Sequence, residues 1–444
     1  MTHRIGFAHA SYPVEEVHAQ MGACLPRASL ALFSEDGRVR WRPRLLVMTA
    51  LMAVWQTAST AGERFSSARG VLTRMFVGRR RSGDTYNGFM AALERQSSSL
   101  FDTLLPWWRG RALAWSGEHG RLFGWTLFGV DGTKINCPRS VANEKSFGCA
   151  GKAGSAPQQL LTVLLHLGSW MPWSWRRGPG TDDERAHLLS MLGDLPADAL
   201  LLADALYTSY ALLSRLIDSK VAFVVRAGAN VKVLRDLGYH VVEEEHIVYL
   251  WPNKQQRRKQ PPLRLRLIRV QDGRSRRMCL LTNVLEPDRL SDAQAVQLYA
   301  RRWGVEVTNR TLKQTLDCST VQSTNHNRAQ VELDWNVAAL AVLALINLRV
   351  ANQRGTDPLR RSPSDAVRLL RQWMFAAHKL VHLALLHQQL AKAELDDYLR
   401  TGPKSTRIWP RKKQTKPPGT PSARKATDSQ IQLAKQLRQQ DPMN

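Results

Sequence analysis

The chain has 444 residues with 63 Lys or Arg and 37 Asp or Glu, so its formal net charge at pH 7 is +26. An enzyme of small molecules has no need of such an imbalance. A protein that binds a polyphosphate benefits from such an excess of cations, because each cation placed against a phosphate releases a counterion and raises the affinity. The hydrophobic content of 43% and the 14 Trp residues are enough for several cores, which argues against a basic ribosomal or membrane-surface protein. The composition therefore favours a globular protein that binds nucleic acid.

No feature of the sequence indicates a membrane or a secretory pathway. The longest apolar run, Val337 to Ile346, has ten residues, which is about half of a membrane span and predicts a buried helix. The N-terminus lacks the apolar segment of a secretion signal. The five cysteines form neither a disulfide framework nor a CxxC zinc pattern. Buried free thiols are the favoured interpretation, the alternative being a metal shared by Cys137, Cys149 and His166, and we expect a cytoplasmic protein.

Residues 1 to 118 have helical patterning, for example from Arg44 to Trp55. Farther along, Asp84 is a candidate N-cap for a helix through Leu93. An arginine triplet precedes it, and such a helix could enter a major groove as in a helix-turn-helix. A simple helical bundle with basic loops explains the pattern nearly as well. The candidate DNA contacts of this region are Arg79, Arg80 and Arg81.

Two aspartates follow short apolar runs between residues 119 and 226. Asp131 ends the run that begins at Trp125, and Asp204 ends the run that begins at Leu200. Such runs are typical of central strands covered on both faces, and catalytic groups gather at the carboxyl ends of these strands. Either aspartate alone could instead be a helix N-cap or a turn residue.

A third acid, Glu306, belongs to a segment with a regular spacing. Tyr299, Arg302, Glu306 and Lys313 lie at offsets of 0, 3, 7 and 14 residues. At about 100° per residue these offsets fall within about 60° of arc, so one helical face would carry a phenol, two cations and a carboxylate. An ordinary surface pair between Arg302 and Glu306 is the alternative. Trp303 lies off this face and is expected in the core.

Together these residues resemble the DDE core of the IS4 family of bacterial insertion-sequence transposases. The motifs Asp131-Gly-Thr and Ala203-Asp204 match its aspartates, and Tyr-x2-Arg-x3-Glu-x6-Lys matches its Tyr-Arg-Glu-Lys signature. The spacings of 73 residues between the aspartates and 102 residues to Glu306 also agree. The resemblance covers roughly residues 120 to 350 and says little about either end. It implies DNA transposition, with Asp131, Asp204 and Glu306 as catalytic residues.

The order of elements over residues 119 to 226 is strand, strand, strand, helix, strand, helix, strand, which a ribonuclease-H-like fold requires. In that fold the first and fourth strands are adjacent, which would place Asp131 beside Asp204. We therefore expect an α/β protein with a ribonuclease-H-like core and helical flanks. The expected regions are a helical DNA-binding and dimerisation region (1–118), the first part of the core (119–226), a β-rich basic insertion (227–290), the Glu-bearing helix and the next helix (291–350), a C-terminal helical region (351–400) and a disordered basic tail (401–444).

The expected insertion contains three strand candidates, 246–251, 263–269 and 278–283. Residues 253 to 277 contain ten Lys or Arg and one acid, Asp272. A solvated basic hairpin is the simplest explanation. We favour a hairpin that lies on DNA beside the active site, since IS4-type transposases carry an insertion here. Farther on, Ser362-Pro363 is a helix start signal.

Three carboxylates packed within a few ångströms repel unless cations neutralise them. Oxygen ligands select hard cations, so we expect two Mg²⁺ ions, which Mn²⁺ can replace, at Asp131, Asp204 and Glu306. Two ions about 3.5–4 Å apart can bind the attacking and leaving oxygens of an in-line phosphoryl transfer.

The same resemblance assigns DNA contacts around the acids. Arg302 and Lys313 would meet phosphates beside the scissile bond, and Tyr299 would donate to a phosphate or stack at the DNA terminus. Lys134 is a further candidate contact. The expected partners are the transposon ends and target DNA, both double-stranded. A homodimer is expected because two ends must be joined, and the bacterial nucleoid is the expected place of action.

Two other functions stay open, a catalytically inactive domesticated DNA-binding protein and a ribonuclease-H-like nuclease without strand transfer. One departure from the family concerns relatives that cut through a DNA hairpin. They hold a flipped base with a tryptophan, where this chain has Met278. Trp251 could substitute from another strand. The sequence leaves hairpin formation open.

Overall fold

The computed structural model describes residues 10–11, 13–31, 40–76, 82–149, 155–237, 246–252, 260–272, 276–376, 381–382, 384–395 and 419–440. The chain forms two compact units, each assembled from separate stretches of sequence. The first unit comprises residues 1–121, 132–187 and 304–395, and the second comprises residues 122–131, 188–303 and 396–444. Arg79, Arg80 and Arg81, the predicted DNA contacts, lie outside the described residues.

The first unit is mainly helical and carries one long antiparallel hairpin. The hairpin pairs β4 (Gln158–His166) with β5 (Met171–Pro179). Short strands β1 (Ala10–Ser11) and β12 (Val381–His382) pair separately. The helices are α1 (Pro13–Ala23), α2 (Arg27–Ala31), α3 (Pro43–Trp55), α4 (Ala61–Met75), α5 (Tyr86–Ser116), α6 (Val141–Phe147), α7 (Glu184–Leu189), α11 (Trp303–Arg310), α12 (His326–Arg354), α13 (Pro363–Phe375) and α14 (Ala384–Lys392).

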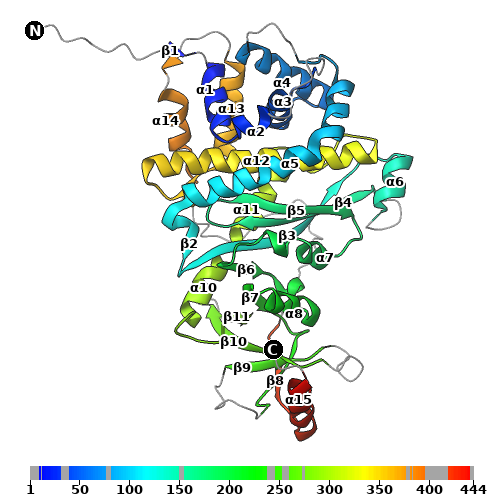
Figure 1. Ribbon diagram of the computed structural model, residues 1–444, viewed down its shortest axis with the longest axis vertical. Helices are drawn as coiled ribbons and strands as arrows, with labels where there is room; N and C mark the ends of the chain where they lie inside the picture. Colours follow the sequence, from blue (N-terminus) through cyan, green and yellow to red (C-terminus); the bar gives the residue numbers. More distant parts are fainter. Residues whose placement is uncertain are drawn as a thin grey trace, which may run out of the picture. The chain divides into compact units, whose positions relative to one another are not determined.

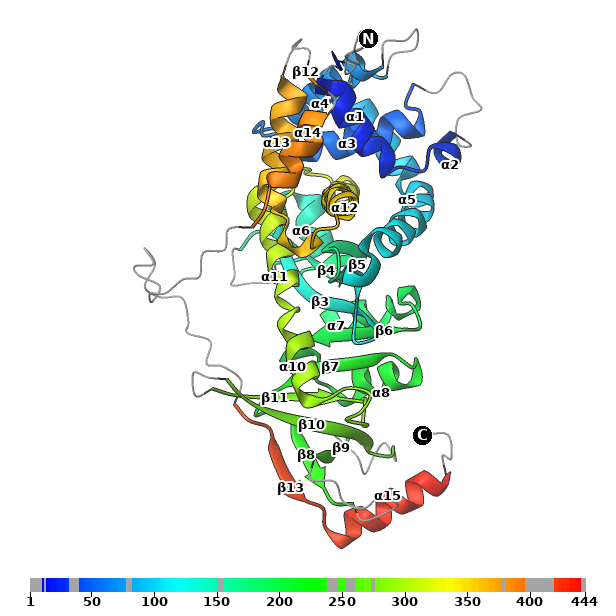
Figure 2. The same ribbon diagram turned by 90° about the vertical axis from the view of Figure 1, so that its left-hand side faces the viewer.

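Helix α12 is the core of the first unit. Figure 2 shows it nearly end-on, with α3, α5, α13 and the β4–β5 hairpin around it. The Asn325 side chain caps its start by accepting from the N–H groups of Asn327 and Arg328, and Gly355 ends it in a left-handed conformation with φ +63°. The predicted buried run 337–346 lies in this helix and is buried. Although α12 is long and apolar enough to cross a membrane, 89% of its most apolar window is covered by protein.

The sheet of the second unit includes β3 (Trp125–Asn136), a strand that continues into the first unit and is the neighbour of β4 in the same sheet. Strand β3 pairs in parallel with β6 (Ala199–Ala203), and β6 pairs in parallel with β7 (Ala222–Ala227). The sheet then continues through antiparallel neighbours (Figure 1). These are, in order, β11 (Arg276–Thr282), β10 (Leu263–Asp272), β9 (Ile247–Leu250) and β8 (Lys232–Arg235).

The order predicted for residues 119 to 226 is present as β3, β4, β5, α7, β6, α8 (Tyr210–Asp218) and β7, except that the helix α6, which was not predicted, lies between β3 and β4. Within the expected insertion, strands are present at all three predicted places, and they extend the central sheet. One of its cations faces inward, since Arg266 is 1% exposed and donates to the carbonyl of Leu285 at 3.3 Å. The prediction of a basic hairpin that lies on DNA is therefore wrong for Arg266, which ties β10 to the loop before α10 (Asp292–Ala300).

The prediction of a disordered tail is wrong for residues 419–440, whereas residues 401–418 and 441–444 lie outside the described residues. Strand β13 (Ser422–Lys425) pairs in parallel with β8. Helix α15 (Asp428–Gln440) places Ala434 and Leu437 against a core made by Leu234, Tyr249 and Trp251. Few apolar residues suffice here because most of this core comes from β8, β9 and the residues that directly follow these two strands.

Two helix starts tested the capping predictions. Ser362 caps α13 by accepting from the Asp365 N–H, with Pro363 in the first turn, as predicted. Asp84 does not cap α5. Thr85 does, by accepting from the Gly88 N–H, and the helix continues for 31 residues to Ser116, well past the predicted end at Leu93.

Candidate active site

Strands β3 and β6 bring two acids to the same level of the sheet. Their register pairs Thr126 with Ala199 and Gly129 with Leu202. Continued by two residues, it sets Asp131 opposite Asp204. In-register side chains of neighbouring strands point to the same face, and the strands lie about 4.8 Å apart. Two carboxylates therefore share one face at the carboxyl end of β6.

Asp204 begins a short helical turn directly after β6, whose five residues are all buried. Its Oδ1 accepts a hydrogen bond of 2.8 Å from the Leu206 N–H. The capping role considered from the sequence is therefore present. Because a carboxylate has two oxygens with about four acceptor sites, capping leaves capacity for a cation.

Tyr299, near the end of α10, lies close to Asp204. Its side chain is 8% exposed, and burial raises the pKa of the phenol. The cations of Arg302 and Arg226 oppose this rise, whereas the Asp204 carboxylate adds to it. Arg302 donates a hydrogen bond to the phenol, and its guanidinium carbon lies 5.8 Å from the centroid of the Tyr299 ring. The Tyr299 phenol thus lies within electrostatic reach of the two cations and of Asp204.

Arg226 is a site residue that sequence reasoning missed. The register of β6 with β7 pairs Ala203 with Val225, so Arg226 follows at the level of Asp204. Its side chain is half-buried, and its carbonyl accepts from the Thr208 hydroxyl at 2.7 Å. The available signal was a charged residue at the end of an apolar strand, the same signal that selected the two aspartates.

Glu306 and Lys313 belong to the first unit. Glu306 is half-buried in the first turn of α11, between the buried residues Val305 and Thr308. The start of α11 packs closely on the β4–β5 turn, since a Cβ on Gly304 would lie 2.5 Å from the indole nitrogen of Trp170. Lys313 lies in a π-helical turn, Thr311–Thr315, that continues α11.

Comparisons with known proteins show which family this chain resembles. A family model described as "Transposase DDE domain" matches residues 126–342. The transposase InsG of insertion sequence element IS4 from Escherichia coli strain K12 is 26% identical over 324 residues, which are 68% of this chain and 70% of that protein. The chain belongs to the IS4 family of DDE transposases.

The search of solved structures gave a piggyBac transposase synaptic complex with hairpin DNA. It is 13% identical, with a TM-score of 0.40, over 88% of this chain and 84% of that one. At this TM-score the likeness serves only as a description. The assignment of this IS4-family transposase rests on the family model and on the IS4 relative.

The transposase signature does not lie on one continuous helix, so that prediction is wrong. Helix α10 ends at Ala300, and the N–H groups of Arg301 and Arg302 bond three residues back in a tight turn. Helix α11 starts anew at Trp303. Since the π-helical turn also changes the angle per residue, the 100° repeat does not extend to Lys313. Trp303, expected in the core, is 54% exposed.

Among the described residues of the transposase, no three His, Cys, Asp or Glu side chains form a group that could hold a metal. The proposed alternative of Cys137, Cys149 and His166 is therefore not a metal centre. Cys137 is a buried free thiol, and Cys149 is exposed. The carboxylate pair on β3 and β6 fits a hard divalent cation because both donors are oxygens. Lys134, three residues past Asp131 on β3, is exposed.

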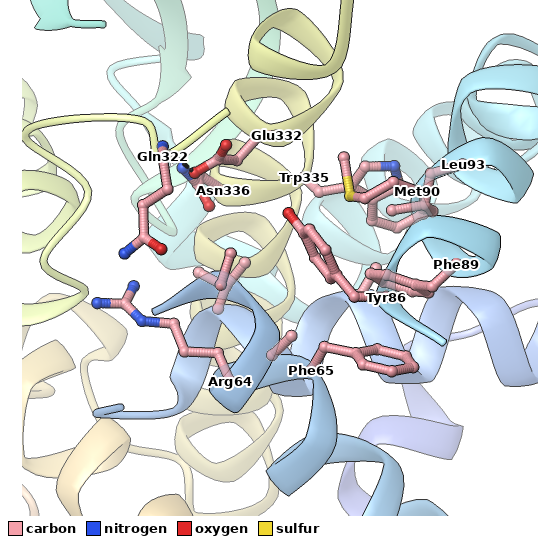
Figure 3. Close-up of a pocket in the computed structure, with 14 residues that line it drawn as sticks. Arg64, Phe65, Tyr86, Phe89, Met90, Leu93, Gln322, Glu332, Trp335 and Asn336 are labelled. Carbon is pink, nitrogen blue, oxygen red and sulfur yellow. Dashed lines mark hydrogen bonds between the residues drawn. The ribbon is translucent and has the colours of Figure 1, made fainter. Parts of the chain in front are cut away.

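A pocket in the first unit is separate from these acids in sequence (Figure 3). It has a volume of about 60 Å³ and is lined by residues of α3, α4, α5, α12 and the loop before α12. This volume is smaller than that of an engineered apolar cavity of about 150 Å³ that holds benzene. Its polar lining residues are Arg64, Tyr86, Gln322, Glu332 and Asn336.

Proposed function

We propose that this transposase cleaves DNA at the ends of its insertion sequence and joins the freed 3′-hydroxyls to target DNA. The observation that carries the proposal is the register of β3 and β6, which sets Asp131 opposite Asp204. The strand order β5-β4-β3-β6-β7 supports a ribonuclease-H-like core, in which such a pair lies at the active centre. Glu306 is proposed as the third acid.

The oxygen donors of Asp131 and Asp204 fit a hard cation. We propose that Glu306 joins this pair when two Mg²⁺ ions bind, since the three acids, all among the described residues, do not form a metal-holding group in the structure. When bound, the ions would activate the attacking oxygen and stabilise the leaving oxygen. Cleavage forms a bond from a water oxygen to phosphorus and breaks the bond from phosphorus to the 3′-oxygen. Joining repeats the step, with the new 3′-oxygen attacking a target phosphorus and displacing a target 3′-oxygen. The carboxylates would position these oxygens by holding the ions that bind them.

The cations around the acids would hold the phosphates. Arg302 and Arg226 lie beside Tyr299, and a phosphate near this phenol could take hydrogen bonds from all three. Lys313 and Lys134 are proposed as further phosphate contacts. Helices of residues 1–118 are proposed to bind the transposon ends, with a homodimer holding the two ends together in the bacterial nucleoid.

Hairpin formation is not part of the proposal. Met278, on β11, occupies the place of the base-holding tryptophan of relatives, and it is half-buried. Trp251, the considered substitute, is 7% exposed and belongs to the core beneath α15. A ring so enclosed is not free to stack on a flipped base. This favours cleavage followed directly by joining.

A donor plasmid with the inverted repeats that flank the gene, incubated with Mg²⁺ and target DNA, tests the proposal. We expect cleavage at the repeat ends and covalent joining to target, both abolished by EDTA. Cleavage without joined product would instead indicate a nuclease. End binding without either product would indicate an inactive DNA-binding descendant.

A further inference from the structure

The segment from Leu316 to Asn325, called here the linker segment, connects the π-helical turn of Lys313 to α12. It lies along the end of β3. The Asn136 N–H donates to the Ser319 carbonyl at 3.1 Å, and the Val321 N–H donates to the Asn136 carbonyl at 2.9 Å. The chain that follows Lys313 is thereby bonded to the strand that carries Asp131, five residues beyond that acid.

The linker segment also bonds to the N-terminal helices. The Arg64 guanidinium on α4 donates to the Asp317 carboxylate at 3.0 Å. Just before α4, the Ser59 carbonyl accepts from the Gln322 side-chain amide at 2.9 Å. Asp317 has a left-handed backbone with φ +56°, which is strained for a residue other than glycine and must be held by its surroundings.

One carboxylate, Glu332 on α12, holds the far end of this segment. Its Oε1 accepts from the Gln322 N–H at 2.8 Å. Its Oε2 accepts from the Ser323 N–H at 3.0 Å and from the Ser323 hydroxyl at 2.7 Å. Two backbone N–H groups that no helix or sheet satisfies therefore depend on one side chain. Such a full set of donors is what stabilises a carboxylate away from water.

The pocket of Figure 3 lies directly beside this anchor. Glu332 and Gln322 line it together with Arg64, and the Tyr86 hydroxyl approaches them and hydrogen-bonds to Ser323. At about 30 Å³ per water, the 60 Å³ space holds about two waters. Gln322, the residue of the linker segment that lines the pocket, consequently has open space on one side, and direct bonds hold it there.

We propose that Glu332 is a positioning residue for DNA cleavage. Glu332 holds the linker segment and thereby fixes the Lys313 end of the signature against β3 and α4. The helices proposed to bind the transposon ends are in this way connected to the segment that carries Glu306 and Lys313. Glu332 itself touches neither DNA nor metal in this scheme. The inference rests on the proposed function and adds Glu332 to the three carboxylates that the proposed cleavage requires.

Glu332→Gln is the decisive variant. The amide keeps the volume but turns an N–H donor toward a backbone donor, so part of the anchor is lost. We expect the cleavage rate of bound ends to fall at least tenfold, while the Kd for end DNA changes less than twofold. Asp334→Asn is the matched control on the same helix, because Asp334 accepts from Trp175 and Arg177 and has no bond to the linker segment. This control should lower Tm and leave the cleavage rate of folded protein unchanged.

Alkylation of Cys318 gives a second readout that does not depend on cleavage. This thiol is 2% exposed within the linker segment, and burial raises its pKa to about 12, as for the equally buried Cys24 outside the segment. In Glu332→Gln we expect labelling by iodoacetamide at pH 8, mapped by mass spectrometry, to rise at Cys318 and not at Cys24. A parallel rise at both thiols would mean general destabilisation and would overturn the inference.

The two proposals fail in different ways. If wild type cleaves and Glu332→Gln cleaves bound ends equally fast, the positioning role is refuted and the proposed function stands. If wild type does not cleave its ends at all, the proposed function fails and this inference falls with it.

Discussion

Asp131 and Asp204 lie opposite each other on two parallel strands that are hydrogen-bonded from Thr126–Ala199 to Gly129–Leu202. The pairing stops two residues before the acids, and Asp204 is the first residue after β6, so the strands set the level of the two acids while the hydrogen bond from the Leu206 N–H holds the Asp204 side chain. Two like charges held at the same level of neighbouring strands raise the free energy of the folded protein unless a cation is bound between them. The pair is therefore proposed to hold a divalent cation, whose oxygen ligands it can supply.

Neutralising either aspartate should therefore abolish cleavage without preventing end binding. We expect Asp131→Asn, Asp204→Asn and Glu306→Gln each to lower the cleavage rate by a factor of about a thousand or more, equivalent to ~4 kcal/mol. Gel assays of end binding and cleavage in Mg²⁺ measure both effects. Asp198→Asn is the control, because Asp198 accepts from the Thr126 hydroxyl at 2.8 Å at the other end of the same strands. Retained cleavage by a folded variant would remove that residue from the mechanism.

Removing the Tyr299 hydroxyl should weaken the hold on the scissile phosphate. Tyr299→Phe keeps the ring beneath Arg302 and loses only the hydroxyl, so we expect the cleavage rate to fall about tenfold, equivalent to about 1.4 kcal/mol, with little change in Tm.

Arg302→Ala and Lys313→Ala should reduce cleavage and end-complex formation together, by more than the loss of a surface ion pair. If the Arg302 and Lys313 double variant were merely less stable and fully active, these cations would have a structural role only.

The sequence was sufficient to locate the strands β3 and β6, because apolar runs closed by an acid are a local signal, although β3 continues past Asp131 to Asn136. It was insufficient for the helix that carries the signature. Spacing predicts a face only if the helix is unbroken, and the turn at Arg301 depends on how α10 and α11 each pack. Trp303 is exposed for the same reason, since the helix phase restarts there.

The C-terminal residues show a second limit of sequence reasoning. The composition of residues 401–444 is typical of disorder because they contain few apolar residues. Ala434 and Leu437 nevertheless complete a core whose other members lie about 190 residues earlier, around Trp251. Local composition does not indicate a core that a distant segment supplies.

Leu437→Ala should therefore destabilise the second unit. Its side chain is 5% exposed against Tyr249 and Trp251, so we expect a loss of about 2–5 kcal/mol in the free energy of unfolding. Urea unfolding followed by circular dichroism measures this loss. Lys435→Ala, on the exposed side of α15, should change stability little. If Leu437→Ala were equally neutral, α15 would not belong to the core.

The pH dependence of stability should include a contribution from Glu332. Burial raises the pKa of this carboxyl above its ordinary value of 4.5, so the folded protein holds the proton more tightly than the unfolded chain does. Stability then falls as the pH rises from 4.5 through the folded pKa, with a slope of up to about 1.4 kcal/mol per pH unit. Glu332→Gln should flatten this part of the profile of unfolding free energy. An unchanged slope would mean that Glu332 titrates normally.

Gly304→Ala tests the close approach of α11 to the β4–β5 turn, two residues before Glu306. Inside a helix, alanine is ordinarily the better residue, and Gly70→Ala on α4, where an added Cβ meets nothing within 4 Å, should stabilise the protein by about 0.5–1 kcal/mol. At Gly304 the same methyl would lie 2.5 Å from the rigid indole of Trp170, so we expect a loss of about 1–3 kcal/mol and slower cleavage. Thermal unfolding of the two variants side by side separates helix propensity from packing. A stabilised Gly304→Ala would show that α11 has room to shift, and the placement of Glu306 would then not depend on this contact.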